Sequence, residues 1–149
     1  MTLKYYWDDF QVGQKTVLGS KSFTKESIIS FAEKYDPQFF HTDERLAIES
    51  SYGGLISSGW QTCSEMMRLI CDSYLLETAS LGSPGIENLR WIKPVRPGDK
   101  ITLSREIKSK RLSRTNPKIG IVDILFEASN QNNDLVLSMQ VCQMVSPKK

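Results

Sequence analysis

The sequence predicts an α+β fold in which a curved antiparallel sheet wraps around one long central helix. Between residues 60 and 75, apolar side chains recur at steps of three and four, which is the period of a helix with a broad apolar face. After Pro84 the pattern changes to runs of strand-forming residues joined by short turns, which is typical of antiparallel strands. Because the helix has to bury its apolar face, we expect it on the concave side of the sheet.

Length and composition are those of an ordinary globular protein. The chain has 149 residues, and we expect one domain that spans residues 1–149. Hydrophobic residues make up 40% and charged residues 24%, which excludes a disordered or fibrous chain. The net charge of +2 is too small to indicate nucleic-acid binding, and no RNA- or DNA-binding motif is present. We therefore expect no nucleic-acid partner.

Three features of the sequence favour a cytoplasmic protein without a membrane partner. No apolar run approaches the ~20 residues that a membrane-spanning helix needs. The first residues, MTLKYYWDDF, are too aromatic and acidic for a signal peptide. The cysteines, Cys63, Cys71 and Cys142, are odd in number and form no CxxC pair, so we expect buried free thiols and a reducing compartment.

The N-terminal part predicts a strand over residues 13–23 that leads into a helix. Thr24 is a suitable N-cap for this helix, and apolar residues follow it at helical spacing. Pro37 disfavours helical backbone at the residue before it, so the helix should end near Asp36. The apolar positions that define this helix are Ile28, Ile29, Phe31, Ala32 and Tyr35.

A loop is expected after the first helix, and it contains His41, the only histidine of the chain. Thr42 can cap a short second helix with Asp43 and Glu44 in its first turn, where carboxylates suit the helix dipole. The glycine-rich stretch YGGLISSG then bends the chain toward the central helix.

The central helix should begin after Ser57 or Ser58, either of which can cap it. Its apolar stripe is broad, so we expect other parts of the structure to enclose most of the helix. The stripe consists of Trp60, Cys63, Met66, Met67, Ile70, Cys71, Tyr74 and Leu75.

The C-terminal half predicts strands separated by polar turns. The strand KITLSREIKS alternates Ile101, Leu103, Arg105 and Ile107, which is the pattern of a strand buried on one face. A turn at residues 96–99, RPGD, precedes it. The other strands are IENLRWIKPV, KIGIVDILFEAS and LVLSMQVCQMV, and the polar turn NQNND separates the last two.

We expect the chemistry at the start of the central helix. The first N–H groups of a helix lack intrahelical acceptors, and the helix dipole adds positive potential there. Gly59 has no side chain to shield its amide, so the carbonyl oxygen of a ligand can approach closely. The alternative is that the glycines only form a turn and that SSG is only a cap.

Asp36 and His41 can supply proton transfers at this site. A histidine titrates near neutral pH and can both take up and return a proton. The proline-broken segment lets both side chains point into one cavity, with Phe39 and Phe40 lining an apolar cleft. On spacing alone, His41 could instead be an ordinary hydrogen-bonded residue, and Asp36 could only terminate the preceding helix.

Several stretches along nearly the whole chain resemble the MaoC-like dehydratase family, hot-dog proteins that include (R)-specific enoyl-CoA hydratases. In the family's order, these stretches are YYWDDFQVGQ, FAEKYDPQFFHTDE, YGGLISSGW, LRWIKPVRPGD and RLSRTNPKIG. Asp36 and His41 match the acid and the histidine of the family pattern Asp-x-Asn-Pro-x-His. Gln38 and Phe39 depart from it, because they stand where the pattern has asparagine and proline. Gly59 falls on the family's glycine at the start of the central helix.

The resemblance implies a single hot-dog fold and the reversible addition of water to a trans-2-enoyl thioester, giving an (R)-3-hydroxyacyl thioester. It implies that Asp36 and His41 hold and polarise the water, with His41 chiefly as the base, while the Gly59 amide binds the thioester oxygen. CoA or acyl-carrier protein would carry the acyl group. No cofactor or metal is required, and the chain lacks histidines and cysteines at zinc-ligand spacing. A homodimer with continuous sheets, or a higher homo-oligomer, is also implied.

Other parts of the sequence are expected near the substrate, or leave alternatives open. The basic stretch over residues 105–118 is either a solvated strand and loop or a phosphate-binding segment. The side chains expected beside the substrate are Phe39, Phe40, Gly54, Ser58 and Trp60. The basic residues of the stretch are Arg105, Lys108, Lys110, Arg111, Arg114 and Lys118.

Two other functions are compatible with the same fold. A hot-dog thioesterase would hydrolyse the thioester, commonly with a carboxylate on or near the central helix, and Glu65 is the only acid within the first turns of that helix. A non-catalytic acyl-binding or accessory protein is the second alternative, and the departure at Phe39 favours it.

Overall fold

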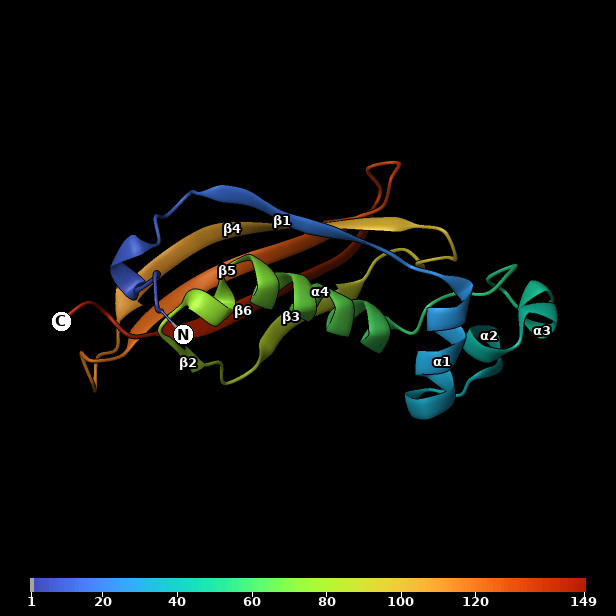
Figure 1. The fold of residues 1–149 in the computed structure, drawn as a ribbon, viewed down its shortest axis with the longest axis horizontal. Helices are drawn as coiled ribbons and strands as arrows, with labels where there is room; N and C mark the ends of the chain where they lie inside the picture. Colours follow the sequence, from blue (N-terminus) through green and yellow to red (C-terminus); the bar gives the residue numbers. More distant parts are fainter. Residues whose placement is uncertain (1) are drawn as a thin grey trace.

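The computed structural model describes residues 2–149 and has the α+β architecture that the sequence predicts (Figure 1). The strands form one sheet in the order β1-β4-β5-β6-β2, and β3 also pairs with β6. The strands are β1 (Lys15–Ser22), β2 (Ser80–Gly82), β3 (Ile86–Trp91), β4 (Lys100–Leu112), β5 (Gly120–Ser129) and β6 (Leu135–Val145). The helices are η1 (Trp7–Asp9), α1 (Lys25–Tyr35), α2 (Phe39–Thr42), α3 (Glu44–Ile48), α4 (Gly59–Ser73) and η2 (Leu75–Glu77).

The sheet is antiparallel throughout, and its long strands are β4, β5 and β6. The inward positions of β4 are buried as the alternation predicts, including Arg105. A register shift between Ile107 and Ser109 interrupts the pairing of β4 with β5, and such bulges add bend and twist to a strand. β2 and β3 pair with successive parts of the same edge of β6; the sequence did not predict β2, which is only three residues long.

The central helix α4 packs along the concave side of the sheet (Figure 1). Met66 and Ile70 face the sheet and lie in the hydrophobic core together with Leu103, Ile124 and Phe126. The expectation that other structure encloses most of α4 is wrong for the described residues, because Trp60 is 58% exposed and several other stripe residues are partly exposed. These partly exposed residues are Met67, Cys63 and Cys71.

The three cysteines are free thiols, as expected, but their predicted burial is only partial. Cys63 and Cys71 lie on the side of α4 that the sheet does not cover completely, and Cys142 lies on β6. Burial still raises the pKa of the Cys63 and Cys142 thiols, so they are neutral near pH 7.

The three short helices α1–α3 form a unit at one end of the molecule, while η1 and the C-terminus lie at the other end (Figure 1). The Thr24 side chain accepts a hydrogen bond from the Ser27 N–H at the start of α1, and α1 ends at Tyr35, both as predicted. The prediction that Thr42 caps the next helix is wrong. Asp43 is the cap of α3, and its carboxylate accepts from the Leu46 N–H at 3.0 Å.

The sequence suggested a loop around His41, but the structure places this residue in the single helical turn α2. The turn forms because the Gln38 carbonyl accepts hydrogen bonds from the His41 N–H and from the Thr42 hydroxyl. Thr42 therefore ends one helix and cannot begin the next.

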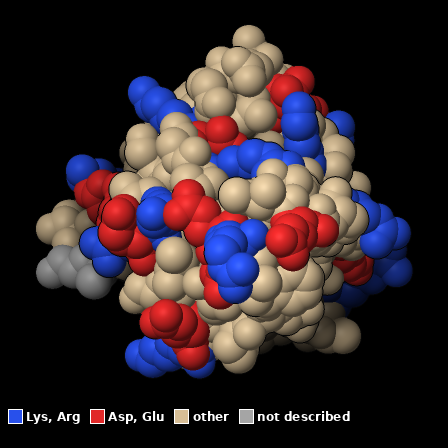
Figure 2. All heavy atoms as spheres, turned by 90° about the vertical axis from the view of Figure 1, so that its right-hand side faces the viewer, with Lys and Arg blue, Asp and Glu red and all other residues tan. Residues whose placement is uncertain are grey.

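Charge is distributed evenly on the face that this end of the molecule presents. Figure 2 shows basic and acidic side chains interspersed there, without a large area of one sign. Within residues 2–149, no helix is long and apolar enough to cross a bilayer.

Candidate active site

The structure brings Asp36 and His41 together at the end of α1. The His41 Nε2 atom lies 3.3 Å from the Asp36 Oδ2 atom, although the two residues belong to different helices or their caps. The imidazole is almost completely buried, and the carboxylate is largely buried. The predicted convergence of the two side chains is therefore confirmed, and their catalytic role remains a prediction.

The backbone of the glycine-rich bend determines the tautomer of His41. Its Nδ1 atom lies 2.7 Å from the Ile56 carbonyl oxygen. A carbonyl oxygen only accepts hydrogen bonds, so Nδ1 must carry a proton. In the neutral imidazole the second nitrogen, Nε2, then has a free lone pair, which faces the Asp36 side of the site. His41 is thus oriented to accept a proton at Nε2.

Asp36 is held by two side-chain donors in addition to its contact with His41. Gln38 Nε2 donates to Oδ1 at 2.8 Å, and the Ser58 hydroxyl donates to Oδ2 at 2.7 Å. Burial raises the pKa of Asp36, but these two hydrogen bonds and the nearby imidazole outweigh it and hold the pKa below its usual value. Asp36 is therefore ionised at neutral pH and fixed in one orientation.

A cavity of about 540 Å³ opens beside this pair. Asp36, His41 and Gly59 all line it, so the three residues predicted to be catalytic share one cavity. Of the residues expected beside the substrate, Phe40 and Trp60 also line it. Apolar walls come from several elements and consist mainly of Tyr52, Ile56, Trp91, Ile92, Val95 and Val136.

The remaining residues expected beside the substrate lie off the cavity wall. Phe39 is largely exposed and packs edge-on against Phe40 at a centroid distance of 5.2 Å. Gly54 packs under the Arg96 side chain, whose guanidinium donates to the Tyr52 carbonyl. Neither residue lines the cavity.

Ser58 was expected to contact the substrate, but it is completely buried beneath Asp36. Its Oγ donates to the carboxylate and also accepts from the Trp60 N–H at 3.3 Å, so it caps α4. Ser58 therefore links the start of α4 to Asp36 and acts as a positioning residue.

Gly59 lies at the first position of α4, where its N–H finds no acceptor among residues 2–149. The Trp91 indole covers its α-carbon and donates from Nε1 to the Gly59 carbonyl at 3.0 Å. A Cβ atom at this position would lie only 2.3 Å from the ring. Glycine is thus required here by the Trp91 packing, in addition to the ligand access that the sequence suggested.

The sequence reasoning missed several contributors to the site. Gln38 was noted only as a departure from the family pattern, but it is a direct donor to Asp36. The Ile56 carbonyl is a backbone contact and leaves no signal in the sequence. Trp91 reaches the site from β3, and its place in the LRWIKPVRPGD stretch was the only signal for it.

The residues invoked for other chemistries are placed elsewhere. Glu65 pairs with Lys21 of β1 at 3.8 Å and does not line the cavity. Among residues 2–149, no group of three or more His, Cys, Asp or Glu side chains is arranged to hold a metal ion. The candidate site therefore combines one carboxylate, one imidazole and one free amide on the wall of a cavity that both apolar and polar side chains line.

Comparison with known families decides which proteins this chain is related to. A family model described as MaoC like domain matches residues 9–127. The chain belongs to this family. This MaoC-like chain is 28% identical to the uncharacterized protein YdeM of Bacillus subtilis (strain 168), over 93% of its own length and 96% of YdeM. It is 30% identical to Protein MaoC of Klebsiella aerogenes over 70% of its own length, but this match spans only 31% of that longer protein.

Solved structures agree with this assignment. A MaoC-like dehydratase from Rhodospirillum rubrum superimposes with a TM-score of 0.90 at 31% identity, over 98% of this chain and 99% of the other. An (R)-hydratase from A. caviae involved in PHA biosynthesis shares the fold, with a TM-score of 0.71 at 24% identity over 94% of this chain and 98% of that protein. The MaoC-like chain thus has the hot-dog fold, as the resemblance implied.

Proposed function

We propose that this chain catalyses the reversible addition of water to a trans-2-enoyl thioester, giving an (R)-3-hydroxyacyl thioester. One observation carries the proposal. The free Nε2 lone pair of His41 and the ionised Asp36 carboxylate lie 3.3 Å apart on the wall of a cavity that also holds the Gly59 amide. A water in the cavity that donates to both groups would have one proton acceptor, Nε2, and one charged hydrogen-bond acceptor, the carboxylate.

The first part of the reaction would use His41 as the base. As the water oxygen bonds to C3 of the enoyl group, Nε2 takes a proton from the water, and Asp36 holds the other O–H. The electrons of the C2–C3 double bond then move toward the thioester oxygen. Asp36 also stabilises the imidazolium that forms, because its own negative charge is adjacent. Return of that proton to C2, by way of the same pair, would restore the thioester.

The Gly59 amide would stabilise the intermediate state. The thioester oxygen becomes enolate-like while C3 is attacked, and the unpaired N–H at the start of α4 can donate to it. The loss of one such donor typically costs about 2.7–4 kcal/mol of barrier. The apolar walls, including Phe40 and Val95, would exclude bulk water and strengthen these interactions.

The experiment is the hydration of crotonyl-CoA, measured by loss of the enoyl absorbance. His41→Ala and Asp36→Asn should each lower kcat at least 100-fold, since a positioned acid or base contributes roughly 10²–10⁴-fold. Asp72→Asn is the matched control, because Asp72 is exposed on α4 and pairs only with Arg68. Its rate should stay within about twofold of the unmodified protein's, as is usual for surface positions.

Three results would contradict this function. Unchanged hydration in both site variants would exclude the Asp36–His41 mechanism. Release of free thiol from an acyl-CoA, dependent on Glu65 and not on His41, would instead identify a thioesterase. Tight binding of acyl-CoA without any turnover would indicate an accessory acyl-binding protein.

We further infer that the functional unit is a homodimer formed through the β3 edge. β3 and the adjoining chain expose Ile86, Trp91 and Ile92, and the neighbouring face of α4 exposes Trp60 and Met67. An unpaired edge with large apolar side chains is normally covered in a stable protein. A second copy would cover these residues and lie next to the cavity, since Trp60 and Trp91 line it.

Sedimentation equilibrium tests the dimer. The unmodified protein should have twice the mass of the chain, and Ile86→Glu should convert it to a monomer, because a charge in the interface is left unpaired. Val17→Glu is the matched control, since Val17 is also an exposed β-branched residue but lies on the opposite edge strand, β1. A monomeric unmodified protein at micromolar concentration, or dissociation of both variants, would contradict this interface.

A further inference from the structure

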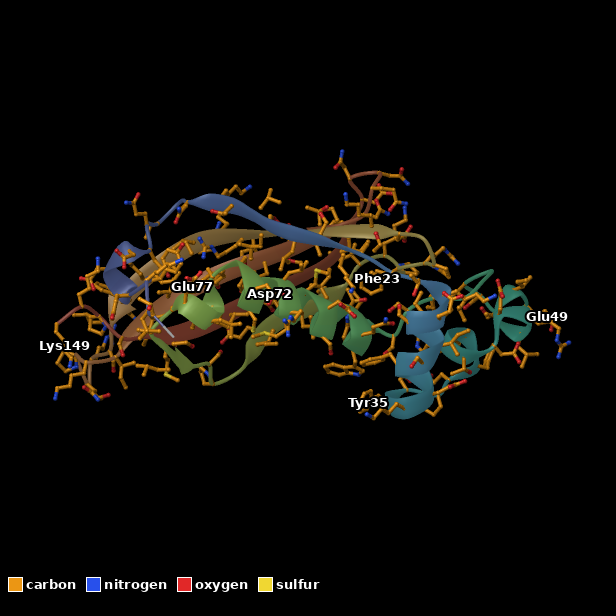
Figure 3. The ribbon with its side chains drawn as sticks, in the orientation of Figure 1. Phe23, Tyr35, Glu49, Asp72, Glu77 and Lys149 are labelled. Atoms are coloured by element: carbon orange, nitrogen blue, oxygen red, sulfur yellow. The ribbon has the colours of Figure 1, made fainter. Side chains whose placement is uncertain are left out.

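A second cavity, of about 280 Å³, lies at the other end of α4 from the Asp36–His41 pair. It is formed by the start of β1, the segment around η1 and the C-terminal end of α4, near Ser73 and Tyr74. The helix has 15 residues and so spans about 22 Å. Figure 3 shows this separation, because Tyr35, which precedes Asp36, and Asp72, which precedes Ser73, lie in different parts of the molecule.

Arg105 of β4 points into this cavity and is the only basic residue in its wall. The side chain is 8% exposed, and its Nε atom is completely buried without a hydrogen-bond partner. The guanidinium lies over the Tyr74 ring at 4.3 Å and over the Phe10 ring at 5.6 Å. The two rings flank the guanidinium, and its buried Nε–H is left without an acceptor among residues 2–149.

No side chain within residues 2–149 neutralises Arg105. No carboxylate of these residues lies within 4 Å of it. Asp9 is the only acid on the cavity wall, and its two oxygens accept from Lys148 at 2.6 Å and from the Tyr6 N–H at 2.9 Å. Glu106, the next residue in β4, pairs with Lys108 and Lys15 on the opposite face of the strand.

The neighbouring tyrosine cannot serve as the counter-ion. Burial raises the pKa of Tyr74 to about 12, and the charge of Arg105 lowers it only in part. The hydroxyl therefore stays neutral near pH 7, and it donates its proton to Gln143 at 3.1 Å. The C-terminal end of α4 adds a weak negative potential, which favours a cation nearby but does not satisfy its N–H groups.

An unpaired buried charge is expensive. An isolated ion loses its hydration on burial, and a guanidinium does not lose its proton to avoid that cost. Proteins retain such a group where it binds something, and the planar N–H edge of arginine matches two oxygens of a carboxylate or phosphate. The polar groups beside it, from Gln14, Thr16 and Ser73, can supply further hydrogen bonds.

From these observations, we infer that the cavity around Arg105 binds a small oxyanion, a carboxylate or phosphate group held edge-on by the guanidinium. This site is independent of the proposed hydration, since it shares no residue with the cavity at Asp36. Of the two interpretations left open for the basic stretch, the solvated one does not fit Arg105, which is buried, whereas Arg111 of the same stretch is exposed.

The test compares thermal unfolding in sodium acetate, sodium phosphate and sodium chloride at equal ionic strength. At 100 times its Kd, a ligand of the native state should raise the Tm by roughly 5–10 °C for a chain of this size. At least one oxyanion should give this saturable rise over chloride, and acetate or phosphate alone would identify which group the site prefers. The rise should disappear in Arg105→Met and persist in Arg111→Met, the same substitution on the same strand.

A direct measurement keeps the inference testable if Arg105→Met does not fold. The Nε–H resonance of Arg105 in the unmodified protein should shift during titration with the active oxyanion, and Arg105→Lys should weaken binding at least tenfold, because an ammonium group cannot form the paired contact. An equal Tm in oxyanion and chloride, a rise that persists in Arg105→Met, or an unmoved Nε–H resonance would overturn the site. Hydration of crotonyl-CoA should be unaffected by Arg105→Lys.

Discussion

A largely buried charged side chain lies near each end of α4, Asp36 at one end and Arg105 at the other, and the two differ in their hydrogen-bond partners. At the N-terminal end, Asp36 accepts hydrogen bonds from Gln38 and Ser58 and contacts His41. At the C-terminal end, Arg105 lies between aromatic rings, and its Nε atom has no partner. Both charges face a cavity, but only the carboxylate has a complete set of protein partners.

This difference indicates what each cavity is built to accept. A carboxylate with fixed donors has one orientation and a lowered pKa, so it can hold a neutral molecule such as water against His41. An unpaired guanidinium retains its full hydrogen-bonding capacity, so it is suited to an anion that brings the missing acceptors. The first end is organised for chemistry, and the second for binding.

The largest expected difference between the two ends of the molecule is in activity, and it is measured by replacing one glycine at each end with alanine. Gly59 lies under Trp91 near Asp36, and Gly120 lies under Trp7 at the opposite end, so an added Cβ would meet the rings at 2.3 and 2.4 Å. Both Gly→Ala variants should lose about 1–3 kcal/mol of unfolding free energy through overpacking. Only Gly59→Ala should also lower kcat, by roughly 10²-fold, because its N–H donor is displaced.

Urea unfolding and the crotonyl-CoA assay on the folded protein separate these contributions. Equal losses of activity in both variants would show that the effect is general destabilisation. Full activity in a folded Gly59→Ala variant would remove this amide from the mechanism and weaken the contrast between the two ends.

A smaller effect is expected from Ser58→Ala, which removes one donor from Asp36 and the cap of α4. The lost cap should cost about 0.5–2 kcal/mol of unfolding free energy. The hydrogen bond from Ser58 helps to lower the pKa of Asp36, so its removal should raise that pKa. The acid limb of the activity profile should then move to higher pH, which a pH series of kcat/KM measures.

The lowered pKa of Asp36 also determines how the stability of the fold depends on pH. The ionised Asp36 stabilises the fold at pH values above its ordinary, unfolded-state pKa, and this contribution is lost as the pH falls through the lower folded-state value. In Ser58→Ala the folded-state pKa should lie closer to the unfolded-state value, so the stabilisation should be smaller and its loss complete at a higher pH. Ser64→Ala is the control, since Ser64 is on the same helix and bonds only the Trp60 carbonyl; an equal shift in both variants would disconnect Ser58 from Asp36.

Much of the architecture was predictable because it depends on local periodicity and capping. Thr24 and Pro37 mark the two ends of α1 correctly, since one supplies a side-chain acceptor and the other prevents further helix. The error at Thr42 arose because Thr42 and Asp43 are both good caps. The choice between them depends on the Gln38 carbonyl, which draws Thr42 into the preceding turn.

The sequence by itself determined the helix-and-sheet pattern, the alternation that turns Arg105 inward, and the Asp36 and His41 spacing that indicated the family. Only the tertiary structure decided which groups meet. The Ile56 carbonyl selects the His41 tautomer, Trp91 covers Gly59, and no acid among residues 2–149 pairs with Arg105. The physical reason is that periodicity is a property of neighbouring residues, whereas hydrogen bonding and charge pairing depend on groups that the fold brings together from distant parts of the chain.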